Sequence, residues 1–178
     1  KDMVIDLEEG LATASNARIE AAGTPVCYTP WLRVPLDDRR RTGLLWPSWG
    51  NDSNGGLDVS VPIYLNLAPN YDATYAPRYI EERGLDHQLQ LRYTNPLVGD
   101  WFAGGAYLHD DDKYKEKVPD GSSERWLGVV RQSGLFRQRW RSRINYSKAS
   151  DVDYMQDLET ANIDDLRRTN LLQLGSID

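Results

Sequence analysis

The eleven residues from Leu57 to Leu67 read LDVSVPIYLNL, and apolar side chains occupy every second position of this stretch. The apolar set is Leu57, Val59, Val61, Ile63, Leu65 and Leu67, and the intervening polar set includes Asp58, Ser60, Tyr64 and Asn66. Because successive side chains of an extended strand point to opposite faces, this alternation predicts a β-strand with one apolar and one polar face.

The same period of two recurs along most of the chain. We expect further strands at Tyr71–Ile80, Asp86–Thr94, Asp100–Leu108, Arg125–Gln132 and Arg137–Ser147, with weaker signals at Leu44–Trp49 and Arg168–Ile177. Several of these runs approach the length that a tilted strand needs to cross a bilayer, whereas strands of soluble proteins are commonly about half as long.

The connections between the expected strands also carry information. The second, fourth and sixth are only 3, 5 and 4 residues long, so the longer connections fall on one side. Short turns on one rim and long loops on the other are typical of outer-membrane barrels. We therefore expect an all-β fold, an antiparallel transmembrane β-barrel fragment of about seven to eight strands.

Composition excludes several other classes. The 178 residues include 21 Lys and Arg against 27 Asp and Glu, a net charge of −6, which disfavours binding to nucleic acid. No apolar run is long enough for a transmembrane helix. The single cysteine, Cys27, excludes an internal disulfide framework, and we interpret it as a small buried hydrophobe, with a reactive thiol as the alternative.

The beginning of the chain has a different character. It is acidic, with short strand-like pieces at Asn16–Ala21 and Pro25–Tyr28, and a charged run, DDRRR, follows at residues 37–41. We place a domain boundary near residue 36. The chain opens without a charged-then-apolar leader, and we expect it to be a piece of a longer protein.

Several stretches are distinctive enough to compare with known families. Residues 28–47 read YTPWLRVPLDDRRRTGLLWP, and residues 62–74 read PIYLNLAPNYDAT. Later come SSERWL at residues 122–127 and YSKASD at residues 146–151, followed by Tyr154. Together they resemble the LptD family, outer-membrane proteins that insert lipopolysaccharide. The likeness extends over about residues 12 to 155.

The resemblance implies a domain plan and a set of partners. Residues 1–36 would be the C-terminal end of a periplasmic β-jellyroll with its linker, and residues 37–178 the N-terminal part of a barrel in the Gram-negative outer membrane. Lipopolysaccharide would be the cargo, the lipoprotein LptE would plug the barrel, and the periplasmic bridge protein LptA would dock on the jellyroll upstream of this chain. The family implies transport, with neither enzymatic activity nor a cofactor.

Prolines are the first candidate site residues. Each lacks the N–H that a sheet ladder needs, so prolines belong at sheet edges, strand starts or bulges. In the LptD family the first barrel strand pairs weakly with the last, and the resemblance implies that Pro47, with Pro30 and Pro35, weakens this lateral gate. The alternative is that they only end strands. Pro62 and Pro77 are expected to cause local bulges near the same seam.

Arginines are the second candidate set. Six arginines and no acidic residue lie between Arg125 and Arg143, and Arg139, Arg141 and Arg143 alternate with Trp140 and Ile144. Guanidinium groups bind phosphates bidentately. We therefore expect these three arginines to face the barrel lumen, where the phosphates and sugars of the cargo would pass. The alternative is a solvated inner wall whose arginines pair with acids.

The remaining features point away from chemistry at a catalytic centre. The six tryptophans fall near expected strand ends more often than strand centres, as an aromatic girdle at the membrane interface requires, although core packing in a soluble sandwich would also use them. The acidic run at residues 109–112 could supply oxygen ligands for Ca²⁺, but we favour a solvated loop balanced by nearby lysines, and we expect no metal site. Familiar catalytic motifs are absent from the sequence.

Two other hypotheses remain open at this point. The chain could be a complete small barrel, since eight strands suffice for closure, although it lacks a terminal aromatic residue. It could also be a soluble β-sandwich that binds or cleaves carbohydrate, for which solubility without detergent is the discriminating observation.

Overall fold

The structure is a computed structural model, and it describes residues 3–6, 11–21, 24–35, 40–52, 55–119, 122–136, 139–158 and 173–177. The chain divides into two compact units, Lys1–Gly43 and Leu44–Asp178. Both are built from antiparallel strands, so the expected all-β class is confirmed.

The first unit contains a three-stranded sheet in the order β1 (Met3–Asp6), β2 (Leu11–Ala21) and β3 (Thr24–Pro35). The pieces expected at Asn16–Ala21 and Pro25–Tyr28 lie inside β2 and β3, which are longer than the sequence pattern indicated. The pairing register shifts between Ile19 and Glu20.

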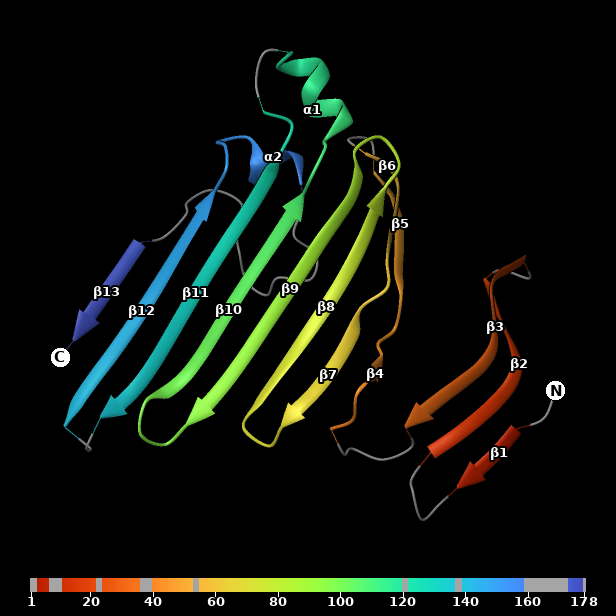
Figure 1. The fold of residues 1–178 in the computed structure, drawn as a ribbon, viewed down its shortest axis with the longest axis horizontal. Coiled ribbons are helices and arrows are strands. Elements are labelled where there is room, and N and C mark those ends of the chain that lie inside the picture. Colours follow the sequence, from red (N-terminus) through yellow and green to blue (C-terminus); the bar gives the residue numbers. More distant parts are fainter. Residues whose placement is uncertain are drawn as a thin grey trace. The chain divides into compact units, whose positions relative to one another are not determined.

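The second sheet contains ten strands that follow one another along the chain (Figure 1). They are β4 (Gly43–Leu44), β5 (Ser48–Asp52), β6 (Gly56–Ser60), β7 (Ile63–Ala68), β8 (Tyr71–Ile80), β9 (Gly84–Asn95), β10 (Gly99–Leu108), β11 (Arg125–Phe136), β12 (Trp140–Ala149) and β13 (Gln173–Ile177). The main path runs β13-β12-β11-β10-β9-β8-β6-β5, and β7 pairs with β4 and β8. This path is open, as in a piece of a barrel wall.

The expected single strand from Leu57 to Leu67 is wrong in one respect, because the structure divides it into β6 and β7. The break falls at Val61 and Pro62, and Pro62 has no N–H to donate to the ladder. The strand expected at Leu44–Trp49 is likewise divided into β4 and β5, with Pro47 directly before β5.

The expected bulge at Pro77 is also corrected. β8 runs without interruption through this residue. Its pairing with β7 at Ile63↔Tyr75 and with β6 at Ser60↔Arg78 has the same register, so no residue is inserted between them. The register shift in this region lies between Asn66 and Ala68 instead. A bulge near the end of a strand costs fewer ladder bonds than one at its centre, which explains its position.

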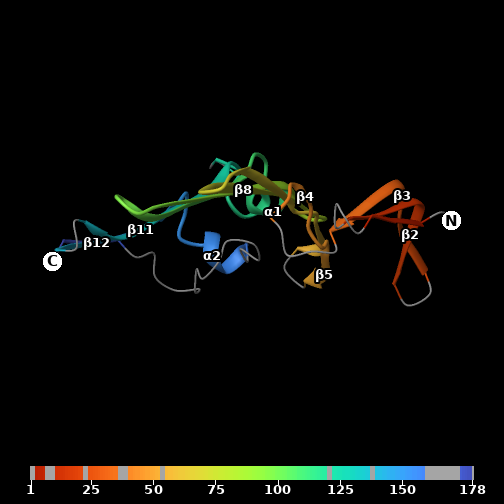
Figure 2. The same ribbon diagram turned by 90° about the horizontal axis from the view of Figure 1, so that it is seen from below.

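The large sheet has two different faces. One carries Ile80, Leu108, Leu127 and Val129, which are buried against Tyr154 and Leu158 of the connection after β12. Figure 2 shows that α2 (Tyr154–Asp157), in this connection, lies beneath the arch of strands, so we call this side the concave face. The opposite, convex face carries exposed apolar side chains.

The connections differ at the two rims of the sheet. At one rim, short turns at residues 69–70 and 96–98 join the strands, and residue 139 directly precedes β12. At the other rim lie the connection with α1 (Asp112–Lys117), between β10 and β11, and the connection with α2, between β12 and β13. Among the described residues, no helix has the length and apolar character needed to span a bilayer.

One turn depends on glycine. Gly99 begins β10 with a φ of 76°, a left-handed conformation that side chains with a Cβ rarely adopt. A Cβ built there would overlap the carbonyl oxygen of Ser133 on β11. The close approach of the two backbones therefore requires glycine at this turn.

We predict that Gly99→Ala destabilises the barrel of the full-length protein by more than about 1 kcal/mol, because alanine is strained where φ is positive. The measurement is the temperature at which the folded form loses its distinct mobility on unheated gels. Gly128→Ala is the matched control, since a Cβ at Gly128 meets no atom within 4 Å. Equal transition temperatures for Gly99→Ala and the wild type would contradict the prediction.

Candidate functional site

Two regions of the large sheet are candidates for function: its β5 edge and its concave face. At the edge, β5 pairs with β6 on one side only, and Pro47 lies directly before it. Leu45 donates its backbone N–H to the carbonyl of Pro62 at 2.8 Å. The break between β4 and β5 therefore lies opposite the break between β6 and β7.

Prolines reduce the hydrogen bonding of this edge. Val61 donates to the carbonyl of Pro77 at 3.2 Å, but Pro77 has no N–H to return the bond. Pro62, Pro77 and Pro47 therefore each remove one potential ladder bond within neighbouring segments. In the described part of the sheet, proline therefore removes more backbone N–H donors near the β5 edge than elsewhere.

The other two candidate prolines lie in the first unit. Pro30 is inside β3, between Thr29 and Trp31, whose partners on β2 are Ala17 and Ser15. Asn16, between those partners, has a φ of 53°, which marks a local irregularity of the pairing. Pro35 ends β3. Within the second unit the structure places Pro47 near Pro62 and Pro77, whereas Pro30 and Pro35 belong to the first unit.

The concave face is rich in paired charges. Arg78 of β8 donates to both carboxylate oxygens of Asp58 on β6, with its shortest contact, from Nη2, at 2.6 Å. Asp72 accepts from Nε of Arg92 at 2.8 Å and from the hydroxyl of Tyr64 at 3.0 Å. These pairs join neighbouring strands across the face, and they satisfy charges that would otherwise be costly to bury.

Three buried polar atoms of this face have no hydrogen-bond partner among the described residues. They are Oδ1 of Asp86, Oε1 of Gln88 and the hydroxyl of Tyr154. Such atoms are costly inside a dry core but are tolerated where a polar barrel interior provides water. Burial also raises the pKa of the Tyr154 hydroxyl, so that this ring stays neutral.

Arg125, the first residue of β11, is the centre of the largest ionic cluster. Its Nη1 donates to Asp111 at 3.0 Å and to Asp157 at 3.1 Å, and its Nη2 donates to Asp151 at 2.8 Å. Asp111 also accepts from Nη1 of Arg83 at 2.9 Å. One fully buried guanidinium therefore joins the connection that contains α1 to the connection that contains α2.

Aromatic rings complete the environment of this guanidinium. The ring centroid of Tyr114 lies 4.3 Å from Cζ of Arg125, and that of Tyr154 lies 5.4 Å away. Burial raises the pKa of the Asp151 carboxyl, but its hydrogen bonds with Arg125 and Ser150 and the positive charge of Arg125 together outweigh that effect, so the net shift of the pKa is downward. The carboxylate form of Asp151 is thus the one that the cluster stabilises.

The sequence pattern does not reveal this cluster, and the expected solvated loop is wrong for one of its members. Asp111 was expected in a solvated loop, whereas the structure buries it completely, where it also accepts from the N–H of Tyr114 to cap α1. The available signal was Arg125 itself, because it shares a face with Leu127 and Val129, and a charge among buried apolar residues requires partners. Among the described residues, no group of three or more His, Cys, Asp or Glu is arranged to hold a metal ion.

The three candidate arginines lie at the opposite end of the sheet. Arg139 is in the turn before β12, and Arg141 and Arg143 alternate along β12 with Trp140 and Ile144. Arg143 pairs with Ser133, in line with Arg131 and Val129 of the concave face. All three are exposed, far along β12 from the end that approaches the Arg125 cluster.

The convex face has the pattern of a lipid-facing barrel surface. Its register aligns His87, Tyr107 and Trp126 in one row across three strands. A second row near the opposite rim aligns Tyr71, Tyr93 and Trp101. Between the two rows lie aliphatic residues that include Leu89, Leu91, Ala103 and Val130. Two aromatic bands that flank an apolar band are typical of membrane barrels.

Comparison with known proteins gives a consistent result. The chain is 42% identical over 160 residues to the LPS-assembly protein LptD of Aliivibrio fischeri, which covers 90% of this chain and 20% of the relative. The proteins of the same name from Pseudomonas aeruginosa and Pseudomonas putida are 41% and 39% identical, over 85% and 94% of this chain and 16% and 18% of their own lengths. No family model matches the chain. The chain thus spans about a fifth of the length of the curated relatives it matches.

We predict that Arg125→Gln releases the segment of residues 150–158 from the concave face, because an uncompensated buried charge costs about 3–5 kcal/mol. Limited chymotrypsin digestion of the full-length protein should then cleave faster at Tyr154, with the cut mapped by mass spectrometry. Arg141→Gln is the control, since Arg141 is exposed.

A milder variant separates release of the segment from loss of the whole fold. Asp157→Asn removes one of the three carboxylates that contact Arg125 and leaves Asp111 paired with both arginines. It should give a smaller increase in cleavage than Arg125→Gln. Digestion at the wild-type rate in both variants would show that the cluster does not hold the segment.

Proposed function

The chain belongs to the LptD family, and from that premise we propose that it forms part of an outer-membrane barrel that delivers lipopolysaccharide to the outer leaflet of Gram-negative bacteria. The observation that carries this proposal is the identity of about 40% to LPS-assembly proteins across most of the chain. The two faces of the sheet support it, since the convex face is apolar with aromatic bands and the concave face carries paired charges beside a small apolar core.

We assign the two compact units to two parts of the transport path. In this proposal Lys1–Gly43 belongs to the end of a periplasmic jellyroll, and Leu44–Asp178 begins the barrel. The rim with long connections would face outward and the rim with short turns would face the periplasm, as is usual in outer-membrane barrels. The chain would then enter the barrel from the periplasm.

The proposed transport involves no covalent chemistry. Lipid chains would travel along the jellyroll, and the sugars and phosphates would pass through the lumen, which corresponds to the concave face. Arg139, Arg141 and Arg143 would offer guanidinium groups to phosphates near the periplasmic entrance. Their exposure and the pairing of Arg143 with Ser133 support this role.

The partners in this proposal are lipopolysaccharide, the lipoprotein LptE and the bridge protein LptA. LptE would occupy the lumen, and LptA would dock on a jellyroll edge that precedes this chain. The charged groups of the concave face suit a protein plug, because they can exchange their hydrogen bonds with water for hydrogen bonds with the plug.

Conditional depletion of the full-length protein tests the proposed function. Surface lipopolysaccharide, labelled on intact cells, should fall while lipopolysaccharide accumulates in the inner membrane, and the wild-type gene should restore export. A matched depletion of an unrelated outer-membrane barrel controls for general damage. Unchanged surface labelling after depletion would exclude a role in export.

The β5 edge carries the lateral-gate hypothesis. A strand edge that has few donors is a weak partner for the next strand, so lipid could leave sideways between the two. Pro47 and Pro62 support this proposal because they lie at breaks in the pairing of adjacent segments, and Pro77 lacks the N–H that would return the bond from Val61. Pro30 and Pro35 would act on the jellyroll side of the same path.

We predict that Pro47→Ala combined with Pro35→Ala in the full-length protein lowers lipopolysaccharide export, because a restored N–H at each position can strengthen pairing by about one hydrogen bond. Surface labelling at equal protein levels measures the effect. Pro96→Ala, in the exposed turn between β9 and β10, is the control. Export at the wild-type rate in the double variant would remove these prolines from the gate.

A further inference from the structure

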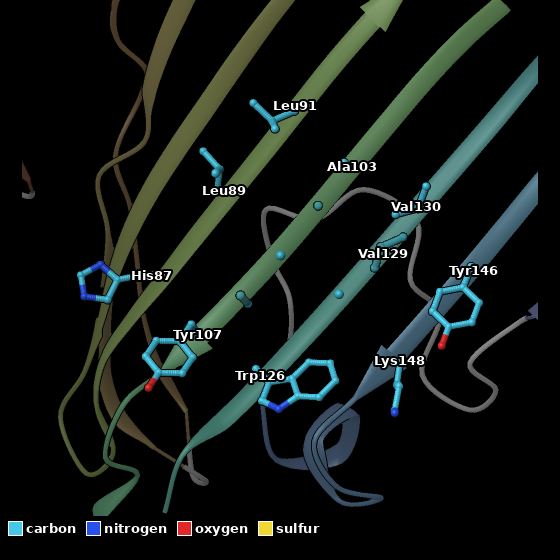
Figure 3. A pocket seen from close by; sticks show the side chains of 14 residues that line it. His87, Leu89, Leu91, Ala103, Tyr107, Trp126, Val129, Val130, Tyr146 and Lys148 are labelled. Carbon is cyan, nitrogen blue, oxygen red and sulfur yellow. The ribbon is translucent and has the colours of Figure 1, made fainter.

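The convex face contains a groove whose floor is made of glycine. Gly105 of β10 and Gly128 of β11 are direct partners in the sheet register. The groove has a volume of about 520 Å³, and its walls include Leu89, Leu91 and Val130 (Figure 3). A depression on an otherwise convex surface results because two adjacent positions have no side chain.

The backbone gives no reason for these two glycines. Neither has a positive φ, a Cβ at Gly128 would meet no atom within 4 Å, and a Cβ at Gly105 would meet only ordinary contact at 3.5 Å. Glycine weakens the interior of a strand, and there it often marks a place where a ligand approaches closely. This distinguishes the pair from Gly99, whose backbone requires glycine.

One end of the groove is polar. Lys148 is the direct partner of Gly128 on β12, and its Nζ lies 6.0 Å from the ring centroid of Trp126. Figure 3 shows Lys148, Trp126 and Tyr107 at the end where the connecting helices lie, while Leu91 and Val130 lie farther along the strands. The groove therefore joins an apolar channel to a cation and amphipathic rings.

We propose that this groove binds the lipid A part of lipopolysaccharide in the outer leaflet, with an acyl chain over the glycine floor and a phosphate at the ammonium of Lys148. The site lies on the outside of the barrel, separate from the concave face. The placement of this site in the outer leaflet rests on the proposed function, in which the rim with long connections faces outward. Lysines near a membrane interface extend their ammonium groups toward the headgroups, where an anionic phosphate is the complementary charge.

The test uses the full-length protein with p-benzoylphenylalanine in place of Tyr146, an aromatic residue that lines the groove. The protein is placed in phosphatidylcholine nanodiscs that contain a minor fraction of bisphosphorylated lipid A, irradiated, and analysed by mass spectrometry. We expect lipid A adducts to be enriched over the share of lipid A in the disc by about five-fold, the factor for one cation beside an anionic lipid.

Two variants and two matched controls make the result specific. Gly128→Leu fills the groove and Lys148→Gln removes the charge, and each should abolish the enrichment. Gly175→Leu, at another strand glycine with nothing within 4 Å, and Lys115→Gln, in α1, should preserve it. A gel-mobility assay on unheated samples confirms that each variant is folded.

Two outcomes would overturn the assignment. Adducts in proportion to disc composition would mean that ordinary boundary lipid occupies the groove. Equal enrichment when phosphatidylglycerol replaces lipid A would mean that any anionic lipid suffices. Export in cells is measured separately, so loss of the groove with normal export is distinguishable from failure of the transport proposal.

Discussion

A single buried guanidinium, that of Arg125, holds together the end of the large sheet where the connections with α1 and α2 lie. It neutralises Asp111, Asp151 and Asp157, which come from two connections that are far apart in the sequence. Because each of these charges is costly to bury alone, their positions depend on one another. The packing of Tyr154 and Leu158 onto the concave face is coupled to this arrangement, since Asp157, which contacts Arg125, lies between these two residues in the chain, directly before Leu158.

Backbone hydrogen bonding imposes the second constraint. In an apolar environment each N–H must find a partner within the sheet, so residues that have no N–H decide where a ladder can stop. Pro47 lies in the break between β4 and β5, and Pro62 lies in the break between β6 and β7. Pro77, in contrast, is accommodated inside β8. The same residue type therefore has different effects at the edge of the sheet and one strand farther in.

Much of the fold was predictable because period-two alternation is a local signal. The strands from Tyr71 to Ser147 were found within a few residues, and the apolar set of Leu57, Val59, Ile63 and Leu65 lies on one face as expected. The Arg125 cluster was not predictable, since Asp111 and Asp151 are 14 and 26 residues away in the chain and meet Arg125 only after strands pair. The groove also escaped prediction, because the facing of Gly105 and Gly128 depends on the register between two strands.

The order of strands has a mechanical consequence. From β8 to β13 each strand pairs with the strand that follows it in the chain. A pulling force on the C-terminal end would therefore act on the hydrogen bonds of one strand pair at a time. At the rim of the Arg125 cluster, however, ionic contacts tie Arg83, Asp111, Arg125 and Asp157 across several hairpins. The wall is therefore stiff at that rim and compliant at the rim of short turns, where neighbouring hairpins can spread apart while the opposite ends remain clamped.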